Sequence, residues 1–225
     1  RINERLTEST DAYEYYLKGK DFENAGSTKE NIEAAIGEYE RAVILDPNFA
    51  EAYALIGVNH LGMKWYGYDL SNDRITLAKK SIDKALELKP NNATVRYGLG
   101  IYHYHGFRNY AEAMKEFRYA LSIEPGSALF NIFGGAIYRR LGDYEKAEKS
   151  MLLAYELDPR STFMLMNLKG TVASNRKYKQ SLSIGDKSMN KDQLSSAWNG
   201  RAYYFMTGDA NTAIQMINKD DFIKM

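Results

Sequence analysis

The sequence predicts an all-α fold, a right-handed superhelical solenoid built from antiparallel helix hairpins. One phrase ending in proline recurs, its copies converge on a fixed period, and small and large apolar residues precede each copy at helical intervals. Because proline cannot continue a helix, each copy marks the end of one hairpin and the start of the next. The prolines are Pro47, Pro90, Pro125 and Pro159, separated by 43, 35 and 34 residues.

The second helix of each of the first four hairpins carries an alanine, a large residue four positions later, and another alanine three positions after that. Spacings of three and four place these side chains on one helical face. We expect the alanines to allow close approach of the paired helix and the large residue to fill the groove between them. The sets are Ala35/Tyr39/Ala42, Ala78/Ile82/Ala85, Ala113/Phe117/Ala120 and Ala147/Met151/Ala154.

The first helices share a glycine that is followed three residues later by a ring, in the pairs Gly57/His60, Gly100/His103 and Gly135/Tyr138. We expect six hairpins in a single domain over residues 1–225. The fifth is degenerate, with serine and glycine at the alanine and large positions, and the sixth is expected to cap the stack. The predicted hairpins span residues 10–46, 50–89, 93–124, 128–158, 162–189 and 195–219.

The repeated phrases resemble the tetratricopeptide repeat family over residues 12–159. Two stretches are similar, at finer grain, to the C-terminal repeat region of bacterial adenylate cyclases, winged-helix regulators and receptor-type Ser/Thr kinases. The resemblance implies an interaction solenoid within a larger bacterial signalling protein, and a chain that begins with Arg1 fits a segment of such a protein. The first stretch, within residues 12–53, runs from Ala12-Tyr13 through Tyr16-Leu17-Lys18-Gly19 and from Ala35-Ile36 through Leu45-Asp46-Pro47-Asn48-Phe49-Ala50-Glu51-Ala52-Tyr53. The second is the turn Tyr104-His105-Gly106-Phe107-Arg108-Asn109-Tyr110, one residue longer than the common form.

The family geometry assigns the concave face to fixed positions of the first helices. At these positions the sequence places apolar and aromatic residues, with a pair of basic residues at the middle. Aromatic and arginine side chains most often anchor interfaces. We predict that the groove binds a peptide or protein with an acidic group. The alternative is that tight curvature buries these residues against one another. The groove residues are Tyr97, Ile101, Tyr104, His105, Leu129, Ile132, Arg139, Arg140, Phe163, Met166, Asn199, Tyr203 and Met206.

The second hairpin exceeds the period by about nine residues, in a segment that carries the rings of Trp65, Tyr66 and Tyr68. An insertion on the edge of a solenoid is a candidate partner-binding loop. The alternative, which we favour, is that two prolonged helices direct these rings against the first hairpin's own insertion, residues 21–29.

The histidines His60, His103 and His105 invite a metal or acid-base interpretation. Helical residues two apart point about 200° away from each other, and metal-binding pairs on helices are three or four apart. We therefore interpret the histidines as packed side chains. The chain has no cysteine, nucleophile elbow or phosphate-binding loop, so we expect no catalytic residue, metal or cofactor, and no enzyme.

A net charge of +1 argues against a nucleic-acid partner, and no apolar stretch reaches the roughly 18 residues that membrane insertion requires. The lack of cysteine fits a bacterial cytoplasm and a periplasm equally, for a soluble chain. We predict a protein-interaction scaffold or sensory module that binds its partner in the concave groove. The alternative is a self-association module, a homodimer that positions an upstream catalytic or DNA-binding domain.

Overall fold

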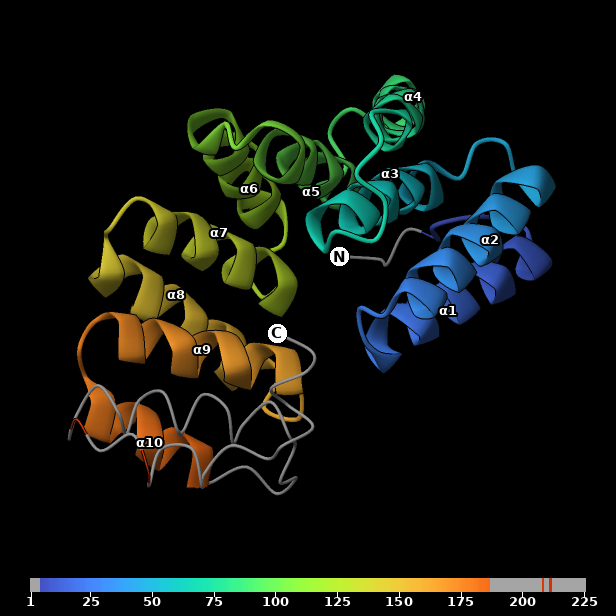
Figure 1. Ribbon diagram of the computed structural model, residues 1–225. Helices are drawn as coiled ribbons and strands as arrows, with labels where there is room; N and C mark the ends of the chain where they lie inside the picture. The colour runs from blue at the N-terminus through green and yellow to red at the C-terminus, as the bar shows by residue number, and fades with distance from the viewer. Residues whose placement is uncertain (1–4, 187–207, 209–210, 212–225) are drawn as a thin grey trace. The chain divides into compact units, whose positions relative to one another are not determined.

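The computed structural model describes residues 5–186, together with Gly208 and Asn211. Over these residues the chain forms ten α-helices and one π-helix and no strand, which confirms the predicted all-α class (Figure 1). The chain divides into two compact units, residues 1–125 and residues 126–225, which we name unit 1 and unit 2. A single solenoid domain over the whole chain stays a prediction.

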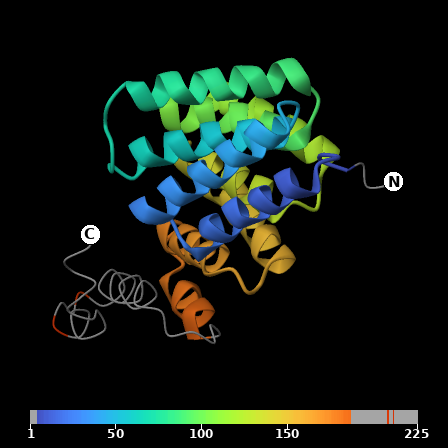
Figure 2. The ribbon, with the colours of Figure 1, turned by 90° about the vertical axis from the view of Figure 1, so that its right-hand side faces the viewer.

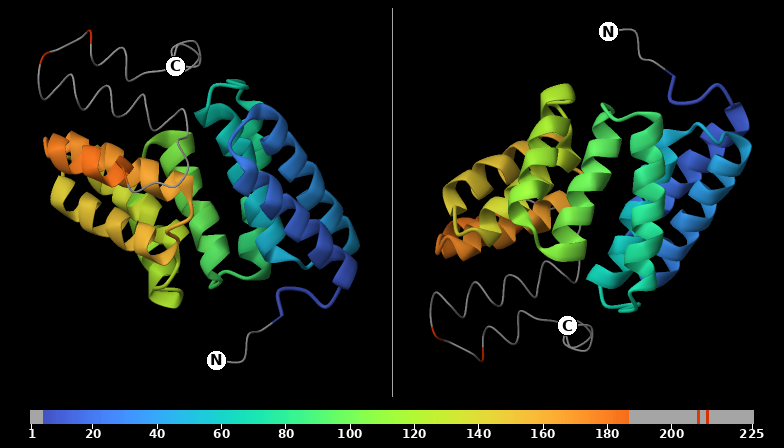
Figure 3. Two further views of the ribbon diagram at one scale, coloured as in Figure 1. Left: turned by 90° about the horizontal axis from the view of Figure 1, so that it is seen from below. Right: turned by 90° about the horizontal axis from the view of Figure 1, so that it is seen from above.

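Unit 1 contains three hairpins, whose paired helices lie side by side (Figures 2 and 3). The pairs are α1 (Thr10–Ala25) with α2 (Lys29–Leu45), α3 (Ala50–Trp65) with α4 (Asp73–Leu88), and α5 (Ala93–Ile101) continued by η1 (Tyr102–Gly106) with α6 (Tyr110–Ile123). The described part of unit 2 contains two hairpins. They are α7 (Ala128–Arg140) with α8 (Tyr144–Leu157), and α9 (Thr162–Ser174) with α10 (Tyr178–Asp186).

These helices begin and end close to the hairpin bounds read from the sequence. The hairpin expected over residues 10–46 runs from Thr10 to Leu45, and the one expected over residues 128–158 runs from Ala128 to Leu157. The expected end of the fifth hairpin at residue 189 and the expected cap over residues 195–219 lie outside the described residues, apart from Gly208 and Asn211.

Short polar side chains determine where most of the helices begin. Each accepts a hydrogen bond from the backbone N–H three residues later, a donor that has no partner within the helix. These N-cap residues are Ser9, Thr28, Asn92, Asn109, Ser127, Asp143 and Ser161.

The core of each of the first four hairpins is the predicted set of an alanine, a large residue and an alanine, and each large side chain lies against a first-helix glycine. A Cβ atom on Gly57 would lie 2.6 Å from Cγ1 of Ile82, and one on Gly135 would lie 2.8 Å from Cγ of Met151. The glycines therefore create the space that the large residues occupy. The large residues are Tyr39, Ile82, Phe117 and Met151, all at most 1% exposed.

The π-helix η1 accommodates the extra residue in the aromatic turn of the third hairpin. Helix α6 begins 17 residues after α5 begins, whereas α8 begins 16 residues after α7. A π-helix holds more residues in one turn than an α-helix, so it absorbs a single-residue insertion without ending the helix. The sequence indicated the longer turn, and the structure shows that the extra residue lies within the helix.

One buried charge joins the second and third hairpins. Glu51 is 1% exposed, and its carboxylate accepts hydrogen bonds from Nζ of Lys89 at 3.2 Å and from Nδ2 of Asn92 at 2.7 Å. The other amide atom of Asn92, Oδ1, caps α5 by accepting from the backbone N–H of Val95. Asn92 therefore pairs a buried carboxylate and starts a helix at the same time.

Candidate functional site

The predicted groove residues of unit 1 lie in its interior. Tyr97, Ile101 and Tyr104 are at most 4% exposed, and the ring of Tyr97 lies 6.0 Å from that of Phe117. Burial, reinforced by the carboxylate of Glu23, raises the pKa of the Tyr97 hydroxyl well above its ordinary value. For these three residues the structure shows the packed alternative, because neighbouring helices cover the side chains.

The rings of the insertion contact other parts of unit 1. Trp65 stacks on His105, with ring centroids 4.1 Å apart, and the hydroxyl of Tyr68 donates to the backbone oxygen of Ser27 at 3.0 Å. Ser27 belongs to the loop between α1 and α2, within the first hairpin's own insertion. These contacts support the structural interpretation of Trp65 and Tyr68. Tyr66 and Tyr68 are nonetheless 44% and 40% exposed.

His60 is a packed side chain in unit 1, as its repeat position predicts. Its Nδ1 atom lies 3.1 Å from Nη1 of Arg74, and Nε of Arg74 donates to Oδ2 of Asp69 at 2.7 Å. Burial, followed by the adjacent Arg74 charge, lowers the pKa of His60 to about 4. His60 is therefore neutral at neutral pH, and its ring accepts a hydrogen bond from the arginine.

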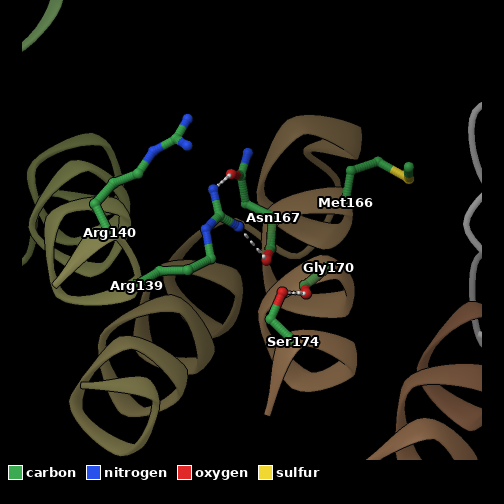
Figure 4. A pocket seen from close by; sticks show the side chains of 6 residues that line it. All are labelled: Arg139, Arg140, Met166, Asn167, Gly170 and Ser174. Atoms are coloured by element: carbon green, nitrogen blue, oxygen red, sulfur yellow. Dashed lines mark hydrogen bonds between the residues drawn. The ribbon is translucent and has the colours of Figure 1, made fainter. Parts of the chain in front are cut away.

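Unit 2 brings three of the predicted groove residues together. Arg139 and Arg140, at the end of α7, line a pocket of about 370 Å³ with Met166 of α9 (Figure 4). We name this the arginine pocket. The other residues that line it are Asn167, Gly170 and Ser174.

The two arginines differ in how they are held. Arg139 extends from α7 to α9, where Nη2 donates to Oδ1 of Asn167 at 3.4 Å (Figure 4). Its Nη1 atom donates to Oγ1 of Thr171 at 3.0 Å. The amide nitrogen of Asn167 donates to the backbone oxygen of Phe163 at 3.0 Å. Arg140 is exposed to solvent. Arg139 therefore joins two helices.

An apolar area lies on the same two helices, nearer their starts. Phe163 of α9 is 43% exposed, and its ring centroid lies 6.3 Å from that of Phe133 on α7. We name these two phenylalanines together with the arginine pocket the α7–α9 face. Two other predicted groove residues of α7 contribute less, because Leu129 is half-buried and Ile132 is buried.

The sequence reasoning missed Asn167, Gly170 and Ser174. A signal was present, because residues 163, 167, 170 and 174 follow at helical spacing and share one face of α9. The predicted groove residues Asn199, Tyr203 and Met206 lie outside the described residues.

The described residues were also compared with the requirements of a metal site and of a membrane-spanning helix. No group of three or more His, Cys, Asp or Glu side chains is placed to hold a metal ion in that part of the chain. Among the same residues, no helix combines the length and the apolar character needed to cross a membrane.

Comparison with known families agrees with this geometry. Residues 68–128 and residues 135–161 each match a family model described as tetratricopeptide repeat. These two segments carry tetratricopeptide repeats. The first match covers α4 and the third hairpin, and the second covers α8 with part of α7.

A curated protein is similar to part of the chain. The chain is 30% identical over 139 residues to anaphase-promoting complex subunit 3 of Schizosaccharomyces pombe, a match that covers 62% of this chain and 19% of that protein. The chain thus spans about a fifth of the length of this relative.

Solved structures show the tetratricopeptide fold at low sequence identity. The protein TTC0263 of Thermus thermophilus matches with a TM-score of 0.68 at 18% identity, over 85% of this chain and 98% of that one. PilW, a type IV pilus biogenesis factor, matches with a TM-score of 0.66 at 17% identity, over 92% of this chain and 91% of that one. PilF of Pseudomonas aeruginosa matches with a TM-score of 0.61 at 18% identity, over 92% of this chain and 88% of that one. At these identities the likeness shows the fold alone.

Proposed function

We propose that this chain is a protein-interaction scaffold that binds a peptide or protein partner on the α7–α9 face. Tetratricopeptide repeats generally act as non-catalytic scaffolds, and the fold is consistent with that role. The observation that carries the proposal is the combination of an exposed phenylalanine, Phe163, with an arginine pair at one pocket. Exposed aromatic residues and arginine are the usual anchors of protein interfaces.

The relative from fission yeast adds support of a general kind. Its name describes a subunit of a multiprotein complex, and this chain matches part of it. We therefore propose that this chain is part of a multiprotein assembly. The proposal does not include the yeast complex itself or its activity.

Site-specific crosslinking tests the proposal. A photoreactive phenylalanine analogue replaces Phe163 in the full chain, and cells that naturally produce the protein supply the extract. We expect one crosslinked partner, identified by mass spectrometry, whose yield falls at least tenfold when Arg140→Glu is added. The same analogue at Phe107, an exposed residue of unit 1, is the control. Equal crosslinking from Phe107, or a yield that Arg140→Glu leaves unchanged, would remove the α7–α9 face as the binding site.

We also propose that the scaffold forms part of a larger bacterial signalling protein. The support is the resemblance of residues 12–53 and residues 104–110 to the repeat regions of cyclases, winged-helix regulators and receptor-type kinases. The gene's complete reading frame provides the test. A cyclase, kinase or DNA-binding domain encoded in it is the expected result, and its absence would contradict this context.

Self-association is the second candidate, favoured by an exposed apolar segment in the insertion. Tyr66 and Leu70 are 44% and 69% exposed within one short turn of unit 1. A homodimer through this segment predicts a mass that falls from dimer to monomer on dilution in light scattering, and a monomer at all concentrations for Leu70→Ser. A concentration-independent monomer of the unmodified chain would eliminate this candidate.

A further inference from the structure

We infer that the exposed face of α8 binds α8 of a second copy of this chain, with the two helices antiparallel about a two-fold axis. The axis passes between Leu152 and Leu153, and Lys149 of each copy lies opposite Glu156 of the other. This inference does not rest on the α7–α9 face, and it assigns the second copy to a different surface from the insertion. It is supported by exposed leucines, by two charges beside them, and by the spacing of these residues.

Three leucines of α8 are exposed to solvent although the helix is packed on its other side. Leu152, Leu153 and Leu157 are 45%, 42% and 42% exposed, whereas the alanine–large–alanine set of this helix is fully buried. Leu153 and Leu157 are one helical turn apart, and Leu152 borders the same exposed side. Apolar side chains that are grouped in this way and rimmed by charges mark a surface for protein contact.

Lys149 and Glu156 lie on the same exposed side as the leucines, and neither has a partner among the described residues. They are about 10 Å apart along the helix, which is too far for the two to pair within α8. Two neighbouring charges, Lys146 and Glu148, form ion pairs within unit 2. Lys149 and Glu156 are therefore available to a second molecule.

The order of these residues along α8 is self-complementary. Lys149 and Glu156 lie equally far from the midpoint between Leu152 and Leu153, about 5 Å on either side at about 1.5 Å per residue. A two-fold axis at that midpoint exchanges the two ends of the helix, so the lysine of one copy meets the glutamate of the other and like leucines come together. A parallel, in-register pair would place lysine beside lysine. The charges therefore select a second copy in the antiparallel orientation.

The exposed segment of the insertion, with Tyr66 and Leu70, lacks this charge pattern. Its acidic residue, Asp69, is already paired with Arg74 at 2.7 Å. Of these two exposed apolar surfaces, the face of α8 thus has the charges that would specify how a second copy binds.

Sedimentation equilibrium of the full chain tests the inference. One helix face per copy is a small contact beside the roughly 800 Å² per partner of stable complexes, so we expect a reversible monomer–dimer equilibrium. Lys149→Glu or Glu156→Lys should each weaken it at least tenfold, because like charges then lie opposite, and the two changes combined should restore the affinity to within about threefold. Lys80→Glu, an exposed charge reversal on α4, is the control and should leave the affinity unchanged.

A monomer at all concentrations, or a double variant that associates no better than the single variants, would overturn the inference. A dimer that Leu70→Ser dissociates and Lys149→Glu leaves intact would also overturn it, and would assign the contact to the insertion. The crosslinking from Phe163 probes a separate surface with a natural partner, so these outcomes leave the proposed function to its own test.

Disulfide trapping tests the orientation of the helices, because the chain contains no cysteine of its own. Lys149→Cys and Glu156→Cys proteins, one of them carrying an affinity tag, are mixed and oxidised. We expect the mixed disulfide to form at least tenfold faster than either self-disulfide, because like positions of the two copies are about 10 Å apart along the axis. Faster formation of the self-disulfides would indicate a parallel pair and overturn the antiparallel arrangement.

Discussion

His60 is held neutral inside unit 1, and this gives the stability of the protein a defined pH dependence. The folded pKa of about 4 lies below the unfolded value of about 6.5, so below pH 6.5 the unfolded chain binds a proton that the folded chain excludes. Stability is unaffected by this group above pH 6.5 and falls as the pH decreases towards 4. The full effect is about 3 kcal/mol.

The variant His60→Gln isolates this contribution, since glutamine keeps an acceptor for Arg74 and does not titrate. Between pH 7.5 and pH 5 we expect the free energy of unfolding of the unmodified chain to fall by about 2 kcal/mol more than that of the variant. Urea unfolding followed by circular dichroism at the two pH values provides the measurement. Parallel losses in both proteins would show that His60 takes up a proton in the folded state.

Adjacent residues have separate roles at the end of α7. Arg139 and Arg140 are identical in chemistry and were predicted together as one basic pair. The structure fastens Arg139 to Asn167 and Thr171 and leaves Arg140 exposed. A rotation of about 100° along the helix separates the two positions, so adjacent residues have different surroundings.

At the scale of helices, close packing depends on a glycine of the first helix and a large residue of the second. The first hairpin uses Gly19 in the same way, because a Cβ atom there would lie 2.5 Å from the ring of Tyr39. The sequence pattern at positions 57, 100 and 135 was recognised, and Gly19 was missed as its equivalent. Gly19 is the tenth residue of its helix, whereas Gly57, Gly100 and Gly135 are each the eighth residue of theirs.

Gly57→Ala tests this packing against Gly37→Ala in the same unit. The new Cβ at Gly57 meets Ile82 and also lies 3.0 Å from the backbone oxygen of Ala78, which cannot rotate away. We expect a loss of about 1–3 kcal/mol in the free energy of unfolding. At Gly37 nothing lies within 4 Å, so alanine is expected to add about 0.5–1 kcal/mol through helix propensity. Chemical denaturation of both variants gives the comparison, and losses of equal size would refute the role of Gly57.

A second test at the scale of helices concerns Asn92, which caps α5 and contacts Glu51. Asn92→Ala removes the cap of α5 and leaves Glu51 short of a donor, so we expect a loss of about 2–4 kcal/mol. Asn109→Ala removes only the cap of α6, with an expected loss of about 1 kcal/mol. Thermal unfolding of the two variants distinguishes them. Equal shifts in melting temperature would mean that the contact with Glu51 contributes nothing.

At the scale of the whole molecule, unit 1 has the helices that a stable repeat stack requires. It contains three full hairpins, the number that repeat architectures need for a stable stack. We therefore expect residues 1–125, produced alone, to be helical by circular dichroism and to unfold cooperatively on heating. Residues 1–106, which lack α6 and with it Phe117, should lose cooperativity. A gradual, non-cooperative transition of residues 1–125 would contradict this expectation.

Much of the fold was predictable from the sequence because its signals are local. The prolines, caps and alanine sets act within one helix or between the two helices of a hairpin, and the observed helices start at or near the predicted positions. The candidate site was predictable in part. Arg139, Arg140 and Met166 were expected in one groove and share one pocket, whereas Asn167 was overlooked because asparagine at that position matched no family pattern.

By itself, the sequence determined the all-α class, the repeat and the residues that fill each hairpin, because these follow from helical periodicity and from residues a few turns apart. The tertiary structure alone decided which first-helix residues remain available to a partner. Tyr104 is buried and Phe163 is exposed although both were predicted to face the same groove. Exposure depends on atoms from helices distant in the sequence, and no pattern within one repeat specifies which of them cover a given side chain.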